Sequence, residues 1–358
     1  MKTVGIYIGA DDDDTENIVP VLETWIESLS DSHQLQLFGS AGLPNIDLKS
    51  AEYVSLTPRS TANPFIKIYN AYKHTTEYLK QEDPDIVLQL WKYNTHAPGL
   101  ALASVQSQIH FGIRFTGDSF AEYKPETGFR KIGIFALLNI LGRIPLRVAD
   151  ALIVFGPYGR SQVTQRGALE ENIGILPPTL AFSDFPPEQS PTKPPEISTN
   201  QDRLTCLFVG RISERKGAQF LSRVIELVSD EVDIEFILIG DGDQSSEIRQ
   251  RFPDELVKQP GYVPHDQIHR YYYHSDIYLH PSAYEGVPLV ILEALACNCR
   301  VIARSAGDIQ VAVEDTVTTP SEMANAIISG RGSGELAKPD LFTPAYQREA
   351  LNELLDLE

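Results

Sequence analysis

Short apolar runs alternate with segments of helical length along most of this 358-residue chain, and that alternation restricts its fold more than any other feature. Nearly continuous apolar strands separated by helices are typical of parallel sheets that are covered on both faces. Strands are expected at Val4–Ile8, Leu35–Phe38, Asp85–Leu90, Ala151–Phe155, Leu204–Val209, Ile234–Ile239, Asp276–His280 and Arg300–Ala303. Helices are expected at Val19–Leu29, Pro64–Leu79, Gly217–Ser229, Pro288–Cys297 and Ala345–Leu355.

A proline-rich stretch divides this pattern in two. Seven prolines lie between Pro177 and Pro195, and because proline removes backbone donors, the stretch is expected to be an extended linker rather than core. Typical domains contain about 100–200 residues, so two domains are expected. We predict an N-terminal domain over residues 1–182, a linker over 183–202, a ligand-binding C-terminal domain over 203–340, and a helix over 341–358 that packs back on the N-terminal domain.

The predicted fold class is α/β, with two Rossmann-like, doubly wound domains. Ligands of such sheets bind at the carboxyl ends of the strands. The two domains are therefore expected to face each other across one ligand-binding cleft.

Composition excludes several classes of protein. The 30 Lys and Arg against 49 Asp and Glu give a formal net charge of −19, so a nucleic-acid partner is not expected. The three cysteines, Cys206, Cys297 and Cys299, argue against a disulfide framework or a zinc site, and no other metal-ligand cluster is visible. The N-terminus does not resemble a signal peptide and no apolar run approaches ~20 residues, so a cytoplasmic location is expected.

The predicted helix Pro288–Cys297 is apolar on every face except at Glu293. Such a helix is buried, and a buried carboxylate is costly unless it is paired. The hydroxyls of a ribose would satisfy Glu293, since a carboxylate accepts two hydrogen bonds at once. The alternative is a structural role, in which Glu293 pairs with a buried arginine or caps a loop.

The residues before this helix predict an anion site. Pro288 suits the first helical turn, which leaves the amides of Gly286, Val287 and Leu289 free to bind an anion. Glu285 lies at the mouth of this amide cradle. Its alternative role is to complement the helix dipole.

A charged loop, Gly210–Gly217, follows one predicted strand and precedes a helix. Cations ahead of a helix N-terminus oppose its dipole, so they are explained if an anion lies between them and the helix. Arg211 and Lys216 are suited to grip a diphosphate. A solvated surface loop is the alternative interpretation.

Two further loops follow strands in the C-terminal half. Gly240-Asp241-Gly242 is at the carboxyl end of a strand, where a ligand loop is expected, although the tripeptide is first of all a turn. Tyr262 and Val263 precede a helix and offer a backbone platform for a flat base, or else an ordinary connection.

Taken in this order, the four pieces resemble the retaining glycosyltransferases of family 4 (glycosyl transferases group 1), which have the GT-B fold. The stretch DIYLHPSAYEGVPLVILEALACNCRVIARSAGDI contains the family's E-x7-E pair as Glu285 and Glu293. GRISERKG matches its diphosphate loop, and ILIGDGDQ and GYVPHDQI match its next two landmarks. The similarity is strong over Leu204–Asp315 and fainter over Leu146–Phe185.

This resemblance implies a reaction and roles for the residues. A hexose-type sugar would move, with retention and without metal or cofactor, from a nucleotide-diphosphate sugar to a glycan, lipid-linked or small-molecule acceptor; UDP is favoured and GDP is the second choice. Glu285, Arg211 and Lys216 would be catalytic, the two cations by neutralising the departing diphosphate. Glu293 would bind the ribose of the donor. The other donor-binding residues would be Gly240 and Asp241 in the turn, Tyr262 and Val263 in the base platform, and Gly286, Val287, Pro288 and Leu289 in the amide cradle.

The sequence departs from the family pattern on the acceptor side. Gly9 is followed by Ala10 and Asp11–Asp14 where many relatives have a Gly-Gly loop. Thr116, followed by Gly117 and Asp118, stands where relatives often have a histidine. After Gly307-Asp308-Ile309 the usual Pro-Glu is Gln310-Val311. We assign Gly9, Thr116, Gly117 and Asp118 to the acceptor side.

The segment Arg130–Arg147 has basic residues around an apolar stretch of helical length. One interpretation is an interfacial helix that brings the protein to the cytoplasmic face of a membrane near a lipid-linked acceptor. The other is a core helix of the N-terminal domain.

Two other functions remain compatible with the sequence. A nucleotide-sugar epimerase on a similar fold would need acid and base carboxylates in the cleft, but not Arg211, Lys216 and the E-x7-E pair together. A catalytically weak sugar-nucleotide-binding protein would fit the departures at Asp11–Asp14 and Thr116.

Overall fold

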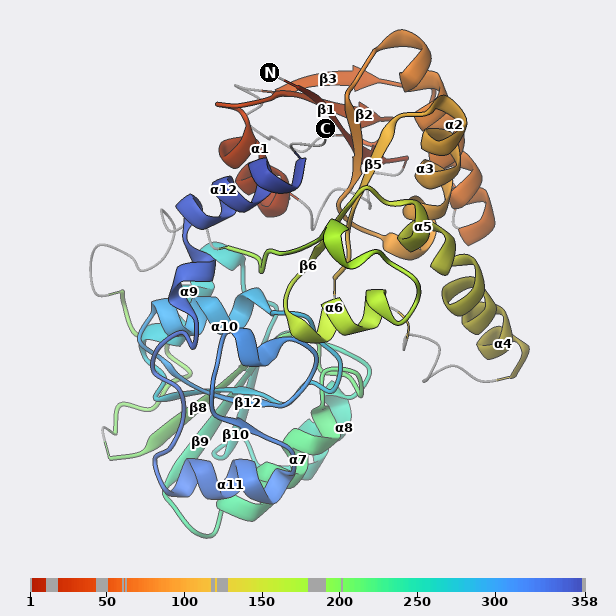
Figure 1. Ribbon diagram of the computed structural model, residues 1–358. Coiled ribbons are helices and arrows are strands. Elements are labelled where there is room, and N and C mark those ends of the chain that lie inside the picture. Colours follow the sequence, from red (N-terminus) through yellow and green to blue (C-terminus); the bar gives the residue numbers. More distant parts are fainter. Residues whose placement is uncertain are drawn as a thin grey trace. The chain divides into compact units, whose positions relative to one another are not determined.

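The computed structural model describes residues 2–10, 19–42, 51–59, 61, 63–116, 120, 128–179, 191–200 and 202–355. They form two compact units (Figure 1). Unit 1 comprises Met1–Thr179 and Asp340–Glu358, and unit 2 comprises Leu180–Pro339. The predicted fold class is confirmed, because each unit is built around a parallel sheet with helices on both faces.

Unit 1 contains a seven-stranded parallel sheet in the order β3-β2-β1-β4-β5-β6-β7. Its strands are β1 (Thr3–Gly9), β2 (Gln34–Gly39), β3 (Ala51–Ser55), β4 (Ile86–Gln89), β5 (His110–Arg114), β6 (Ala151–Val154) and β7 (Ile173–Ile175). Its helices are α1 (Val19–Leu29), α2 (Pro64–Gln81), α3 (Tyr93–Ser107), α4 (Gly128–Ala136), a π-helical turn (Leu137–Leu141), α5 (Arg143–Val148), α6 (Pro157–Thr164) and α12 (Pro344–Leu355).

Alternate residues of these strands pack on opposite faces. Tyr7, Phe111 and Ile113 pack in the core beneath α2 and α3, whereas Val4 and Ile6 pack against α1 and α12. This two-sided burial explains why the strands are apolar runs rather than alternating sequences.

Helix α3 was not predicted, because Pro98 and Gly99 lie inside it. Proline removes one helical hydrogen bond and glycine is a poor helix former. The glycine is used for packing: a Cβ at Gly99 would lie 2.3 Å from the backbone oxygen of Ile68 in α2. Tertiary contact with α2 therefore outweighs local propensity.

The segment Arg130–Arg147 is not one helix. Helix α4 ends at Ala136, the π-helical turn continues to Leu141, and α5 begins at Arg143. Gly142 separates them, and its backbone oxygen accepts a hydrogen bond from the Tyr93 hydroxyl. The apolar stretch is therefore divided between two short helices and a π-helical turn instead of forming one continuous α-helix.

Unit 2 contains a six-stranded parallel sheet in the order β10-β9-β8-β11-β12-β13. Its strands are β8 (Leu204–Val209), β9 (Ile234–Ile239), β10 (Val257–Gly261), β11 (Ile277–His280), β12 (Arg300–Arg304) and β13 (Thr316–Val317). Its helices are α7 (Ala218–Val228), α8 (Ser245–Arg251), α9 (His265–Tyr273), α10 (Leu289–Ala296) and α11 (Pro320–Ile328). Helices α7, α8 and α11 cover one face, and α9 and α10 cover the other (Figure 1).

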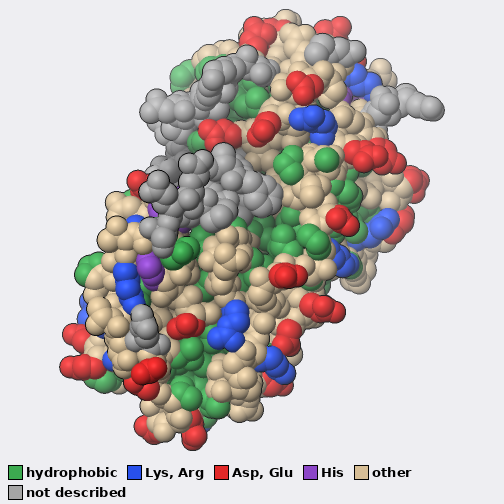
Figure 2. All heavy atoms as spheres, turned by 90° about the vertical axis from the view of Figure 1, so that its left-hand side faces the viewer, with side chains coloured by type: hydrophobic (Ala, Val, Ile, Leu, Met, Phe, Trp, Pro, Cys, Tyr) green, Lys and Arg blue, Asp and Glu red, His purple; other side chains and the backbone are tan. Residues whose placement is uncertain are grey.

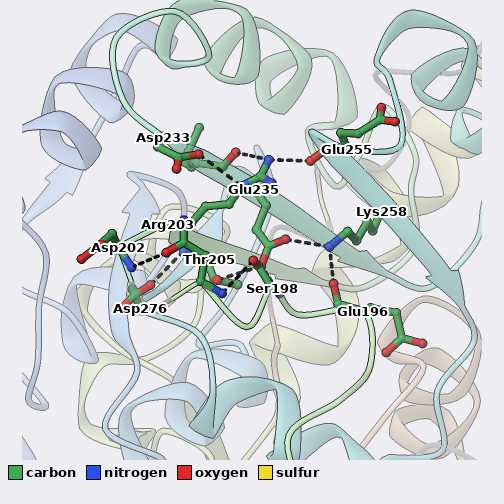
Figure 3. A network of polar contacts seen from close by, with 12 residues as sticks. Glu196, Ser198, Asp202, Arg203, Thr205, Asp233, Glu235, Glu255, Lys258 and Asp276 are labelled. Carbon is green, nitrogen blue, oxygen red and sulfur yellow. Dashed lines mark hydrogen bonds and ion pairs between the residues drawn. The ribbon is translucent and has the colours of Figure 1, made fainter.

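The end of the proline-rich stretch differs from the prediction of an extended linker. The backbone N–H of Ser198 donates to Oε1 of Glu235 at 2.7 Å, and Ile197 is buried. Glu235 is fully buried in β9 and also binds Nζ of Lys258 at 2.7 Å (Figure 3). Residues 191–200 therefore belong to unit 2, because a buried carboxylate needs several donors and this segment supplies one. Residues 180–190 lie outside the described part of the chain.

The last helix, α12, belongs to unit 1. The Tyr346 hydroxyl donates to the backbone oxygen of Ile175, and Nε2 of Gln347 donates to that of Pro177. Leu351 and Leu355 enter the core beside α1. Among the described residues, no helix has the length and apolar character needed to cross a membrane.

Candidate active site

The loops after β8 and β9 are joined at the carboxyl edge of the unit 2 sheet. The N–H of Gly210 donates to the oxygen of Ile239 at 3.0 Å, and the N–H of Ile212 donates to that of Asp241 at 3.1 Å. A Cβ at Gly240 would lie 2.2 Å from the Gly210 oxygen, so glycine is required there. The predicted diphosphate loop and the Gly-Asp-Gly turn are thus adjacent.

The loop after β8 also contacts the loop after β11. Gly217 has φ +80°, and a Cβ on it would lie 2.2 Å from the oxygen of Pro281. The Ser282 hydroxyl donates to the oxygen of Arg215 at 3.2 Å. These contacts place Lys216 next to the residues that precede α10.

Lys216 and Glu285 form an ion pair at this junction. Nζ of Lys216 lies 2.6 Å from Oε1 of Glu285, and Nε2 of the buried His280 lies 3.5 Å from the same oxygen. The hydroxyl of Tyr278 is 3.1 Å from Nδ1 of His280, which orients the imidazole. Burial alone would raise the pKa of Glu285, but the nearby His280 imidazole and the ion pair with Lys216 lower that pKa to about 2. Glu285 is therefore an anion at any physiological pH.

An amide cradle follows Glu285. The backbone N–H groups of Gly286, Val287 and Leu289 make no hydrogen bond with any described residue. Pro288 is the N-cap residue, with φ −73° and ψ 132°, and not the first helical residue as expected. Because the backbone of Pro288 is extended rather than helical, helix α10 begins at Leu289, one residue later than predicted.

The loop after β12 supports the Glu285 backbone. Gly307 has φ +53°, and a Cβ there would lie 1.8 Å from the oxygen of Glu285. No side chain fits this position without moving the Glu285 loop.

Arg211 is exposed at the start of its loop. Within the described ranges it makes no ion pair or hydrogen bond through its side chain. A cation without a partner among the described residues, in the loop at the carboxyl edge of the sheet, leaves room for an anion to bind.

Glu293 is buried in α10, with 4% of its surface exposed. The Tyr272 hydroxyl donates to its Oε2 at 3.0 Å, and Nε2 of His265 lies 3.1 Å from Oε1. The partners are thus a tyrosine and a histidine rather than the arginine that the structural alternative proposed. His265 is exposed at the start of α9, so the buried carboxylate is separated from the protein surface by this side chain.

The base platform lies between β10 and α9. Tyr262 is 82% exposed and Val263 is partly buried. Asp241 is exposed and its Oδ1 accepts the N–H of Gly242 at 2.8 Å, which shapes the turn after β9. The nearby Ser245 hydroxyl and that N–H lower the pKa of Asp241.

The residues assigned to the acceptor side lie in unit 1. Gly9 ends β1 with φ +95°, and its oxygen accepts the N–H of Ser40 at 3.1 Å. Thr116 follows β5. Gly117, Asp118 and Asp11–Asp14 lie outside the described residues.

Sequence reasoning missed a buried cation beside Thr116. The Arg114 guanidinium stacks on the Phe155 ring at 4.8 Å and donates to the oxygen of Leu90 at 3.4 Å. Burial lowers the pKa of Arg114 to about 10. The sequence did contain a signal for this residue, because an arginine stands at the end of an otherwise apolar strand.

Four other residues of unit 2 were also missed: His265, Tyr272, His280 and Gly307. His280 was detectable, because it is a polar residue that ends an otherwise apolar strand at the edge where ligands bind. Tyr272 and His265 come from a different helix than Glu293, and their pairing with it follows only from the packing of α9 on α10.

The region that holds this geometry matches a known family. Residues 203–330 match the model of the family glycosyl transferases group 1. The matched region contains Arg211, Lys216, Glu285 and Glu293. The resemblance to group 1 glycosyltransferases that the sequence predicted is confirmed for this part of the chain.

This chain is also similar to curated proteins, but the similarity covers only part of the length of each. The GPI3 subunit of phosphatidylinositol N-acetylglucosaminyltransferase from Saccharomyces cerevisiae is 28% identical over 158 residues, which is 43% of this chain and 35% of that protein. The chain thus spans about a third of the length of the relatives it matches.

Solved structures extend the likeness to the whole chain. The lipopolysaccharide outer core galactosyltransferase WaaB superposes with a TM-score of 0.70 at 17% identity, covering 99% of each chain. HepE of Anabaena, in complex with UDP and glucose, superposes with a TM-score of 0.67 at 16% identity, covering 99% of this chain and 100% of that one. Both units therefore have the GT-B fold that was predicted around the matched region.

Proposed function

We propose that this protein is a retaining glycosyltransferase that moves a hexose-type sugar from UDP to a lipid-linked acceptor. One observation carries the proposal: the Lys216–Glu285 ion pair lies directly beside the unbonded amides of Gly286, Val287 and Leu289. Cations and free amides around one point suit a diphosphate, and the family match supports that use of them.

In the proposed reaction the leaving group is the nucleoside diphosphate. The bond between the anomeric carbon and the phosphate oxygen breaks, and negative charge builds up on that oxygen. Arg211, Lys216 and the amide cradle stabilise this charge where it develops, which is the most effective form of electrostatic catalysis. These protein cations serve the purpose that a metal ion serves elsewhere, so the proposed mechanism is metal-independent.

Glu285 acts beside the donor sugar as a permanent anion. It holds Lys216 in position and offers its carboxylate to the sugar hydroxyls. Retention follows if the acceptor attacks the same face from which the diphosphate leaves, with a phosphate oxygen taking the acceptor proton. Glu293 would bind the ribose once His265 turns away from it, and Tyr262-Val263 would support the base.

The comparisons support UDP as the nucleotide and leave the sugar open. HepE binds UDP and glucose, WaaB is named a galactosyltransferase and GPI3 belongs to an N-acetylglucosaminyltransferase. The sugars differ while the fold is shared, so we propose only a hexose-type sugar. The acceptor named for the GPI3 complex is phosphatidylinositol, which supports a lipid-linked acceptor here. The three free thiols, all buried, fit a cytoplasmic protein.

A thermal-shift panel of UDP-, GDP- and ADP-sugars tests donor binding, because a ligand that binds only the folded state raises its apparent stability. We expect a shift with UDP-sugars, lost in Lys216→Met. Donor turnover is then followed by UDP release. Equal release by wild type and Glu285→Ala from every donor would overturn the enzymatic proposal. An epimerised nucleotide sugar without transfer would instead favour the epimerase interpretation.

A further inference from the structure

Residues 128–148 of unit 1 carry apolar side chains in two directions. Leu138 and Leu146 are buried in the core, and Ile134 packs against it. Five other apolar residues of the segment point to solvent: Ile132 (64% exposed), Phe135 (43%), Ile140 (62%), Leu141 (40%) and Ile144 (51%). Packing within the described part of unit 1 therefore explains one side of the segment, while these five side chains keep 40–64% of their surface accessible to solvent.

The charge of the segment differs from that of the whole chain. Acidic residues make up 49 of 358 positions, about one in seven, yet none lies between Thr127 and Ala149. The same interval holds four cations: Arg130, Lys131, Arg143 and Arg147. Elsewhere acidic side chains are widely spread, as the face in Figure 2 shows. Positive charge is thus concentrated around the exposed apolar residues.

Two of these cations, Lys131 and Arg143, are not explained by contacts with the described residues. Lys131 and Arg143 are exposed and form no ion pair with a described residue. Lys131 lies in the first turn of α4, and Arg143 is the first residue of α5. A cation at a helix N-terminus opposes the helix dipole, so neither charge stabilises its own helix. Both charges are available to an anionic partner.

The segment is shaped to lie on a membrane rather than to cross it. Helix α4 has nine residues and α5 has six, whereas a span needs about 20. Apolar side chains flanked by unpaired Lys and Arg are the pattern of an interfacial helix on anionic lipid. A second copy of the chain fits less well, since a two-fold contact through this surface would bring like cations together.

We propose that residues 128–148 dock this protein on an anionic lipid bilayer. Ile132, Phe135, Ile140, Leu141 and Ile144 insert below the headgroups, while Lys131, Arg143 and Arg147 contact lipid phosphates. Docking itself does not depend on sugar transfer. The further idea that docking gives the enzyme access to a lipid-linked acceptor rests on the proposed function.

Co-sedimentation of the full chain with vesicles tests the proposal. Vesicles of phosphatidylcholine with about one third phosphatidylglycerol are compared with phosphatidylcholine alone, at low salt and at 0.15 M NaCl, near the ~8 Å screening length. We expect binding to the anionic vesicles that weakens with salt, and little binding to the neutral ones. A wild-type protein that stays in the supernatant with anionic vesicles at low salt would overturn the proposal.

Matched variants separate the segment from the rest of the surface. Ile132→Ser/Ile140→Ser should lower the partition coefficient roughly tenfold or more, since two inserted side chains are lost. Leu169→Ser/Ile328→Ser replaces two other exposed apolar residues and should bind as wild type. Docking through this segment would be contradicted if both double variants bound the vesicles equally. It would also be contradicted if the first variant lost self-association without any change in lipid binding. The thermal shift with UDP-sugar should be the same in all three proteins, so a failure of donor binding is recognised separately.

Discussion

Nζ of Lys216 lies 2.6 Å from Oε1 of Glu285, although 69 residues separate the two in the chain. The lysine comes from the loop between β8 and α7, and the glutamate from the loop between β11 and α10. The contact gathers a cation, an anion and free backbone amides at one point of the unit 2 sheet edge. It explains why both loops are needed for one site.

Removing the cation tests its role in the proposed reaction. Lys216→Met should lower kcat/KM for the UDP-sugar by about 10²–10³-fold, because one preorganised charge on the departing diphosphate is lost. Steady-state kinetics of UDP release provide the measurement. Arg223→Met removes an exposed cation from α7 and should leave the kinetics unchanged. A similar loss in both variants would indicate a general charge effect instead.

The pKa of Glu285 predicts a pH-dependent contribution to stability. A folded-state pKa of about 2 lies below the ordinary 4.5, so the stabilisation is complete above the unfolded value and is lost as the pH falls towards 2. The difference in unfolding free energy between wild type and Glu285→Gln should shrink by about 1 kcal/mol at pH 4 and about 2 kcal/mol at pH 3, relative to pH 7. Urea unfolding at the three pH values measures it. A difference that stays constant would contradict the ion pair.

The buried Glu235 should depend strongly on Lys258. Burial alone would raise the pKa of Glu235, but hydrogen bonds to Lys258 and Ser198 lower it, so the carboxylate is charged in the core of unit 2. Lys258→Met should destabilise unit 2 by about 3–5 kcal/mol, because an uncompensated charge is left buried. Glu235→Gln/Lys258→Met should recover part of the loss. Denaturant unfolding measures both, and a double variant no more stable than the single one would refute this explanation.

The close approach at Gly307 allows a paired test of backbone geometry. Gly307→Ala places a Cβ 1.8 Å from the oxygen of Glu285, whereas Gly330→Ala, also at positive φ, meets nothing closer than 3.6 Å. The second variant should lose about 1 kcal/mol from backbone strain alone. The first should lose more and should also lose the thermal shift with UDP-sugar, because Glu285 is displaced. Equal effects in both variants would show that the Gly307 contact does not hold the site.

Several predicted elements needed only local sequence. The helix expected at Val19–Leu29 is α1, and the strands expected at Leu204–Val209 and Ile234–Ile239 are β8 and β9 with identical bounds. Each is a long periodic or continuous apolar run, where burial and local propensity agree. Helix α3 and the interruption of the helix within residues 128–148 were not predicted. Whether Pro98, Gly99 and Gly142 end a helix depends on the tertiary contacts around them.

The candidate site divides in the same way. Sequence pattern predicted Arg211, Lys216, Glu285 and the amides after it as site residues, since charged residues and glycines between a strand and a helix are unusual unless they meet a ligand. It did not identify Tyr272, whose contact with Glu293 depends on the packing of α9 on α10. His280 was also missed, although its position at the end of an apolar strand was a usable signal.

By itself, the sequence determined the α/β class, the two sheets, the loops that bear charge and the family of residues 203–330, because these depend on spacing along the chain. Tertiary structure decided the pairing of Lys216 with Glu285, the packing of α12 against α1 and the exposure of Ile132 and Ile140. Those features depend on which distant segments meet, and the free energy of burying one side chain is set by the neighbours it finds there.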